Sequence, residues 1–88
     1  MDIRDNNCHN NTDSGIRIRA TSSASRDIFV TGNDISYNYI GIITYMNGTA
    51  ITNNFVTYNT YGTYLYRTDN YVASNTNIGN AVDFTWIR

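Results

Sequence analysis

The feature that most constrains this chain is a pair of asparagines that returns every 21 residues. The first members of the pairs are Asn33, Asn54 and Asn75, and the second members follow five residues later at Asn38, Asn59 and Asn80. A step of 27 residues upstream adds Asn6 and Asn11, again five residues apart. A repeat of this strictness is typical of solenoids, in which each copy forms one coil stacked on the next. The repeat predicts the architecture, whereas the function depends on outward side chains that need not repeat.

The composition favours strands and turns. The 88 residues include no Lys, Glu, Gln or Pro and a single Leu, against 14 Asn, 12 Thr and 8 Tyr. Helix formers are thus scarce, and β-branched, aromatic and turn residues abound. Six Arg and seven Asp are scattered, which argues against nucleic acid or a membrane surface as a partner, because both need a concentrated basic patch. We therefore expect an all-β protein.

Aligned copies separate into chemically distinct rows. One inward row contains Ile3, Val30, Ile51 and Val72, and a second contains Cys8, Ile35 and Val56, with Asn77 breaking it. A glycine row contains Gly15, Gly41 and Gly62, with Asp83 in its last place. Alternation with a period of two, interrupted by Asn and Gly, predicts about three short strands per coil. We expect one β-solenoid domain over residues 1–88, of three to four coils at about 3–29, 30–50, 51–71 and 72–88.

Both Asn rows are expected where the chain turns. Asn tolerates the left-handed backbone conformation, and its amide carries a donor and an acceptor, so that identical residues can hydrogen-bond up the stack. The glycine row needs only a positive φ or a tight inward bend.

The ends of the predicted stack differ from its middle. The first copy is longer because of the polar segment Ala20 to Asp27, which is expected to form a protruding loop. The last copy ends in Phe84, Trp86 and Ile87 without a polar cap. Both ends therefore look like open sheet edges, which proteins normally cover. We expect the chain either to associate with itself or to be a fragment or minimal version of a longer solenoid.

The repeat pattern resembles a known family of solenoids. The segments Val-Thr-Gly-Asn-Asp-Ile-Ser-Tyr-Asn-Tyr-Ile-Gly-Ile (30–42) and Ile-Thr-Asn-Asn-Phe-Val-Thr-Tyr-Asn-Thr-Tyr-Gly-Thr (51–63) are similar to the repeats of right-handed parallel β-helices of the pectate-lyase-like superfamily. That resemblance implies a right-handed parallel β-helix. It also implies contact with polysaccharide, and a location outside the cell or on a virion, as in phage tailspikes, although no signal peptide is evident. The superfamily contains lyases, hydrolases, epimerases and non-enzymatic repeat domains.

Two other solenoids fit less well. A leucine-rich repeat also spaces aliphatic residues around an Asn, but it needs a Leu-rich strand and helix-forming residues. An ice-binding solenoid needs a flat Thr-x-Thr array, and the outward row of Thr31, Thr52 and Ala73 breaks after its second member.

Three aspartates are candidate catalytic residues. Asp27 and Asp69 share a row with Gly48, so they lie two coils apart, about 9–10 Å, at the edge of the separation used by inverting glycosidases. The simpler interpretation is that both are turn residues. Asp13 is considered because Asn11-Thr12-Asp13 resembles an element of polygalacturonases, but the other motifs of that family are absent.

Tyrosines and two arginines are the candidate carbohydrate-binding residues. Tyr37 and Tyr58 share one outward row, and Tyr45 and Tyr66 share another, with Tyr39, Tyr61, Tyr64 and Tyr71 expected nearby. Stacked rings can dock on the apolar faces of sugars, and Arg17 and Arg19 point to the same face of one strand. The alternatives are cross-strand stabilisation of about 0.2–1 kcal/mol per pair, burial under a neighbouring subunit, and a solvated basic pair.

The remaining candidates for chemistry are single residues. His9 flanks an inward row and is expected to face solvent, while Cys8 replaces an aliphatic residue and is expected to be a small buried hydrophobe. One cysteine excludes an internal disulfide, and we expect no metal or cofactor.

The sequence supports three hypotheses for function. The first is a structural or carbohydrate-facing β-helix module without a complete active site. The second is part of a polysaccharide lyase or glycoside hydrolase, and the third is a protein-interaction or self-assembling module that uses its open edges and tyrosine face.

Overall fold

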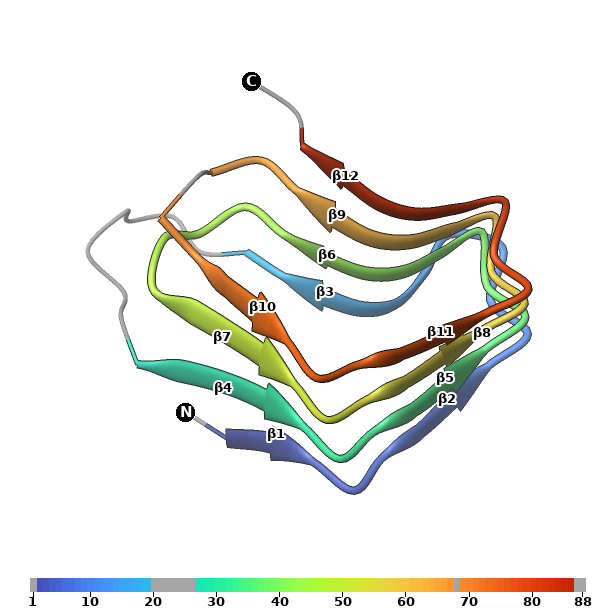
Figure 1. The fold of residues 1–88 in the computed structure, drawn as a ribbon, viewed down its shortest axis with the longest axis horizontal. Coiled ribbons are helices and arrows are strands. Elements are labelled where there is room, and N and C mark those ends of the chain that lie inside the picture. Colours follow the sequence, from blue (N-terminus) through green and yellow to red (C-terminus); the bar gives the residue numbers. More distant parts are fainter. Residues whose placement is uncertain (1, 20–26, 68, 87–88) are drawn as a thin grey trace.

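Twelve strands and no helix make up the described part of the chain (Figure 1). The computed structural model describes residues 2–19, 27–67 and 69–86, apart from the side chain of Trp86. Sheet A contains β1 (Asp2–Arg4), β4 (Ile28–Thr31), β7 (Thr49–Thr52) and β10 (Tyr71–Ala73). Sheet B contains β2 (Asn7–His9), β5 (Asp34–Ser36), β8 (Phe55–Thr57) and β11 (Thr76–Ile78). Sheet C contains β3 (Ser14–Ile18), β6 (Ile40–Thr44), β9 (Tyr61–Leu65) and β12 (Val82–Trp86).

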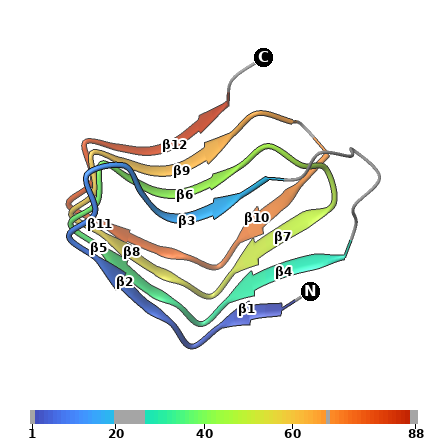
Figure 2. The ribbon, with the colours of Figure 1, turned by 180° about the vertical axis from the view of Figure 1, so that it is seen from behind.

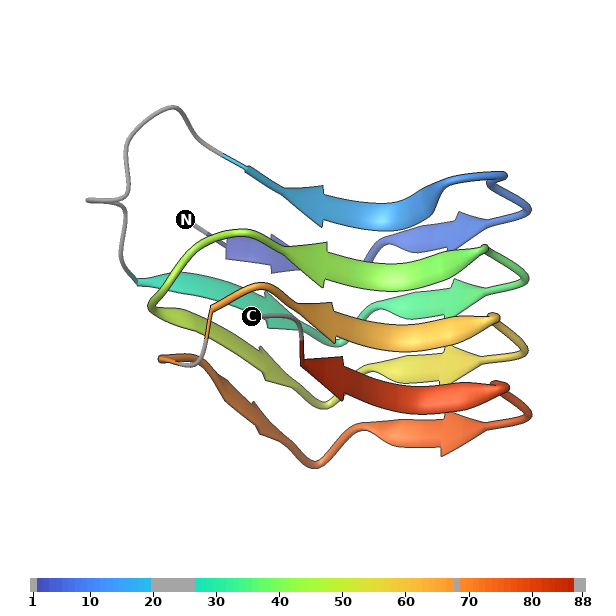
Figure 3. The same cartoon turned by 90° about the horizontal axis from the view of Figure 1, so that it is seen from above.

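The chain passes through sheets A, B and C in that order four times, and we call each passage a coil. Coil 1 is β1–β3, coil 2 is β4–β6, coil 3 is β7–β9 and coil 4 is β10–β12. Neighbouring strands are parallel and keep the rows of the sequence, so that Val30 pairs with Ile51 and Ile35 with Val56. The three sheets form a three-sided column, seen from behind in Figure 2, and Figure 3 shows the coils side by side in chain order.

The expectation of an all-β fold with three strands per repeat is confirmed. The arrangement is consistent with a parallel β-helix. The expected loop at 20–26 lies outside the described residues, as does Ile87. Within the described part, no helix is long and apolar enough to cross a membrane.

The interior is filled by the aliphatic rows. Val30, Ile35, Ile51, Val56 and Leu65 are completely buried, and all five lie in the two middle coils. Ile3, Cys8 and Val72, from the two outer coils, pack against this core but are only partly buried. Burial raises the pKa of the Cys8 thiol. The core is therefore densest in coils 2 and 3 and opens toward both ends of the stack.

The eight repeated asparagines form two hydrogen-bonded ladders. In coils 1 to 3, the amide nitrogen and the backbone N–H of each ladder Asn donate to the Oδ1 of the equivalent Asn in the next coil; from Asn54 to Asn75 both distances are 2.9 Å. In coils 2 to 4, the amide also donates to a backbone carbonyl of the preceding coil, as from Asn54 to Val30 at 3.0 Å. Among the described residues, no buried side-chain nitrogen or oxygen lacks a partner. The ladders thus satisfy polar groups that the turns bring inside.

The expected left-handed conformation of the ladder asparagines is wrong. Positive φ angles occur instead one position earlier, at Asp5, Gly32, Asn53 and Ser74 before the first row and at Asn10, Tyr37, Tyr58 and Gly79 before the second; Asp27 and Gly48 are the other described residues with a positive φ. The left-handed residue lies where the chain turns from one sheet to the next, and the Asn that follows has no positive φ and directs its amide along the stack. Turn formation and hydrogen bonding are therefore divided between two adjacent residues.

Gly79 provides room for an aromatic stack. Tyr37 and Tyr58 are both left-handed, with φ near 57° and 56°, and their rings stack with centroids 5.3 Å apart. A Cβ atom at Gly79 would lie 2.5 Å from Cδ1 of Tyr58, so the ring of Tyr58 covers the glycine. A side chain at position 79 would meet both this ring and the unfavourable positive φ of 72°.

We expect Gly79→Ala to lower the free energy of unfolding by about 2 kcal/mol, of which about 1 kcal/mol is left-handed backbone strain and about 1 kcal/mol is the contact with Tyr58. In a Tyr58→Ala background only the backbone part should remain. A double-mutant cycle by urea denaturation measures the difference. Equal costs in both backgrounds would contradict the ring contact.

Candidate functional site

Five tyrosine rings form a continuous strip on the outer side of sheet C. Tyr61 and Tyr64 lie on β9, opposite Ile40 and Ile43 of β6, and Tyr66 follows β9. Tyr39 precedes β6 and Tyr45 follows it. We call these five residues the tyrosine strip. Successive ring centroids lie 5.5 Å (Tyr39–Tyr61), 5.4 Å (Tyr61–Tyr64), 6.0 Å (Tyr64–Tyr66) and 4.3 Å (Tyr66–Tyr45) apart.

An aliphatic residue lies beside the strip on the outer face of sheet C. Ile43 is only 4% exposed, yet it does not belong to the interior cluster. Because side chains alternate along a strand, Ile43 points away from the buried Ile42 and toward the outer face. Ile43 pairs with Tyr64, so the strip adjoins an apolar side chain on the outside of the column.

Two arginines from coil 1 extend the strip. The guanidinium carbons of Arg17 and Arg19 lie 5.5 Å and 5.3 Å from the centroid of the Tyr45 ring, close enough for cation–π attraction. Arg17 also donates to the Tyr45 hydroxyl at 3.4 Å and forms an exposed ion pair with Asp13 at 3.3 Å. The two side chains thus share one face, as the sequence predicts, and place positive charge at one end of the strip.

The hydroxyl group of Tyr66 is a neutral hydrogen-bonding group. Partial removal from water raises the pKa of Tyr66, and the adjacent Tyr45 raises it further. The Tyr66 hydroxyl therefore stays protonated at any physiological pH and can both donate and accept. The surface combines apolar ring faces with polar edges, which suits a ligand that has apolar faces and hydroxyl groups.

Tyr37 and Tyr58 form a second aromatic site at the turn from sheet B to sheet C. Their rings are nearly parallel, 13° apart, and are 60% and 53% exposed. Both tyrosine pairs that share a row therefore stack: the rings of Tyr45 and Tyr66 are also nearly parallel, 16° apart.

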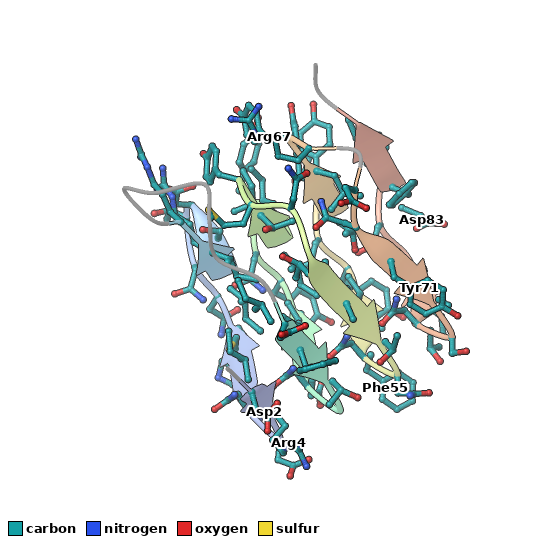
Figure 4. All side chains as sticks on the ribbon, turned by 90° about the vertical axis from the view of Figure 1, so that its left-hand side faces the viewer. Asp2, Arg4, Phe55, Arg67, Tyr71 and Asp83 are labelled. Carbon is teal, nitrogen blue, oxygen red and sulfur yellow. The ribbon has the colours of Figure 1, made fainter. Side chains whose placement is uncertain are left out.

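Tyr71 does not belong to either group of tyrosines. It lies on β10 in sheet A, and Figure 4 shows it well separated from Arg67, the residue after Tyr66. The expectation that Tyr71 is near the other tyrosines is wrong because the chain passes from sheet C to sheet A between Tyr66 and Tyr71.

Asp27 and Asp69 border one open depression on sheet A. It has a volume of about 450 Å³ and also contacts Phe29, Tyr71 and the small residues of the middle coil, Gly48 and Ala50. Gly48 separates the two aspartates: its carbonyl accepts from the N–H of Ile28 at 3.2 Å, and its N–H donates to the Asp69 carbonyl at 2.7 Å. Among the described residues, the walls carry no imidazole, thiol or ammonium group. The depression thus combines two carboxylates with the aromatic side chains of Phe29 and Tyr71, and the Tyr71 phenol is the other group on its described walls that can exchange a proton.

The other chemical candidates do not join this depression. Asp13 pairs with Arg17 beside sheet C, His9 is exposed on β2 and Cys8 faces the interior. Within the described residues no group of three or more His, Cys, Asp or Glu side chains could hold a metal ion. The structure therefore groups Arg17 and Arg19 with the tyrosine strip, places Asp27 and Asp69 at one depression and leaves Asp13 apart from that depression.

Comparison with protein-family models, curated proteins and solved structures gives no match for this chain. Its function has to be argued from the chemistry of its own surfaces.

Proposed function

We propose that this chain is a right-handed parallel β-helix module that binds carbohydrate on its tyrosine strip. Three parallel sheets visited in turn, and two asparagine ladders along them, support the β-helix. The resemblance of the repeats to the pectate-lyase-like superfamily supports its handedness. The proposed location, outside the cell or on a virion, rests on that resemblance alone.

The continuity of the five rings is the observation that supports carbohydrate binding. Sugar rings present flat faces of C–H groups that pack on aromatic faces, while hydroxyls bond to polar side chains at the rim. An extended chain of sugars could contact several rings of the strip in succession. Arg17 and Arg19 at its end would favour a ligand that carries carboxylate or sulfate groups there.

Removal of two central rings tests this function. We expect the double variant Tyr64→Ala/Tyr66→Ala to bind a glycan selected on an array at least tenfold more weakly, because about 1.4 kcal/mol of lost contact corresponds to that factor. Isothermal titration calorimetry gives the two affinities. Tyr71→Ala is the matched control, since Tyr71 is an exposed tyrosine on another sheet, and its affinity should not change.

Three results would count against the proposal. They are the absence of any glycan ligand, undiminished binding by the double variant, and an equal loss in Tyr71→Ala. With an acidic glycan, Arg17→Ala/Arg19→Ala should also reduce the dependence of the affinity on salt concentration.

A further inference from the structure

The two outermost coils carry complementary hydrogen-bonding groups. In coil 1 the Asn6 side chain donates to Asn33, and among the described residues its own Oδ1 accepts no hydrogen bond. In coil 4 the amide of Asn75 donates to the carbonyl of Ile51, but within the described residues its second amide hydrogen and the backbone N–H have no acceptor like the one that their equivalents in Asn54 have at 2.9 Å. Asn6 of a second copy, placed over Asn75, would supply that acceptor. The first ladder could therefore continue from one copy into the next.

The open end of the interior at coil 4 has room for the first coil of a second copy. A depression of about 220 Å³ lies at coil 4 and is bordered by Val72 and Asn77, which occupy the inward rows, and by Phe84, which pairs with the buried Thr63 of β9. Coil 1 presents Ile3 and Cys8, both only partly buried, at the other end. In the register of the repeat, Ile3 of a second copy would lie over Val72. A head-to-tail contact would thus join apolar rows as well as ladders.

Asp83 opposes this contact sterically. It occupies the last place of the row that holds Gly15, Gly41 and Gly62. A Cβ atom at Gly41 would lie 2.6 Å from the carbonyl oxygen of Gly62, and one at Gly62 would lie 2.6 Å from that of Asp83. Each row member thus sits directly under the carbonyl of the next coil. The Cβ of Asp83 would collide with any coil added in the same register, and its carboxylate would face a carbonyl oxygen.

Asp83 also closes the second ladder within the chain. The amide nitrogen of Asn59 donates to Asn80 Oδ1 at 3.1 Å, and that of Asn80 donates instead to Asp83 Oδ1 at 3.1 Å. The carboxylate therefore takes the place of the asparagine of a following coil. The expectation of an end without a polar cap is wrong for this ladder. Figure 4 shows Asp83 at one end of the column and Asp2 and Arg4 at the other.

We propose that the β10–β12 edge is a latent docking surface for the β1–β3 edge of a second copy of this 88-residue chain, and that Asp83 keeps it closed. Charged side chains at sheet edges are a known protection against edge-to-edge association. A head-to-tail contact is heterologous. Once Asp83 no longer blocked it, the copies would therefore form open filaments, unless the rotation from one copy to the next closed a ring.

Substitution of Asp83 tests the proposal. We expect the weight-average mass of Asp83→Gly, measured by sedimentation over a wide concentration range, to rise at least twofold, while the parent chain stays monomeric. Asp83→Ala keeps the Cβ atom without the charge and should also stay monomeric. Asp34→Ala, which removes an exposed charge on β5, is the control. Assembly of Asp83→Ala or of the parent, or a folded Asp83→Gly that remains monomeric, overturns the proposal.

Cross-linking tests the direction of the contact without relying on mass alone. Asn7 on β2 and Thr76 on β11 belong to one outward row, so in a head-to-tail contact their Cα atoms would lie about 4.8 Å apart, within reach of a disulfide. In an Asp83→Gly/Cys8→Ser background, Asn7→Cys and Thr76→Cys chains should cross-link when mixed. Either chain cross-linking equally well with itself, or no cross-link in the mixture, contradicts the arrangement. In the Asp83→Ala background the mixture should not cross-link.

Discussion

Replacing Asn54 by Ala should lower the free energy of unfolding by about 4 kcal/mol. The substitution leaves buried backbone groups without hydrogen-bond partners, and each such group costs about 1–3 kcal/mol. Asn54 is 2% exposed. Its Oδ1 accepts the backbone N–H and the side-chain amide of Asn33, at 3.0 Å and 2.9 Å. Its Nδ2 donates to the carbonyl of Val30 at 3.0 Å. Removal of the amide leaves these partners unpaired inside the column.

The loss is large compared with the stability of the whole protein. A chain of this size is typically stable by only about 5–15 kcal/mol, so one ladder residue accounts for a substantial share. Alanine also leaves a void between coils 2 and 3, which adds a packing cost. Urea denaturation followed by circular dichroism measures the change, with an unaltered m value indicating that the native fold is kept.

Two controls test whether the loss of stability depends on the ladder position or follows from replacing any asparagine. Asn7 is exposed on β2, and Asn7→Ala should stay within about 0.5 kcal/mol of the parent. Asn6 belongs to the ladder but only donates to Asn33, so Asn6→Ala should fall between the two. If Asn54→Ala cost no more than Asn7→Ala, the ladder would not be the main polar support of the column.

The sequence predicts the rows of this fold well because the repeat reports directly on the stacking of coils. Residues 21 apart, such as Ile35 and Val56, become neighbours in a parallel sheet. The period also identifies the ladder asparagines, since an amide has both a donor and an acceptor for the next copy. The period does not identify which residue takes the left-handed conformation at each turn. The preference of Asn for the left-handed region favours the ladder position, whereas the structure uses the residue before it, even where this is Tyr37.

The candidate site is only partly predictable for a related reason. The period places Tyr45 beside Tyr66, and these rings stack. The contacts of Tyr64 with Tyr61 and Tyr66 run along one strand and its end, so they depend on ring orientation, which no period encodes. Tyr71 shows the converse error: closeness in sequence to Tyr66 does not make it a neighbour, because a corner of the column lies between them. The row assignments therefore predict contacts between coils better than contacts around a coil.

Gly41→Ala is expected to cost about 3 kcal/mol, at the upper end of what overpacking a core usually costs. A Cβ atom there would lie 2.6 Å from the carbonyl oxygen of Gly62 and 3.2 Å from both Asn59 Nδ2 and Val56 Cγ1. Two of these atoms belong to the backbone and the ladder, which cannot move without lengthening hydrogen bonds between coils 2 and 3. The glycine is required by this close approach and not by a positive φ, since Gly41 is not among the described residues with one.

The same row provides the comparison for this prediction. Gly15→Ala meets its nearest atoms at 2.9 Å and lies in the outermost coil, which can shift away, so it should cost less than Gly41→Ala. Thr52→Ala on the outer side of sheet A should cost less than either. Thermal and urea unfolding of the three variants give the order. A tolerated Gly41→Ala would show that a Cβ atom fits beneath the next coil. The steric argument that Asp83 prevents a further coil from docking would then fail as well. Both arguments depend on the same close approach of a carbonyl oxygen to the row below.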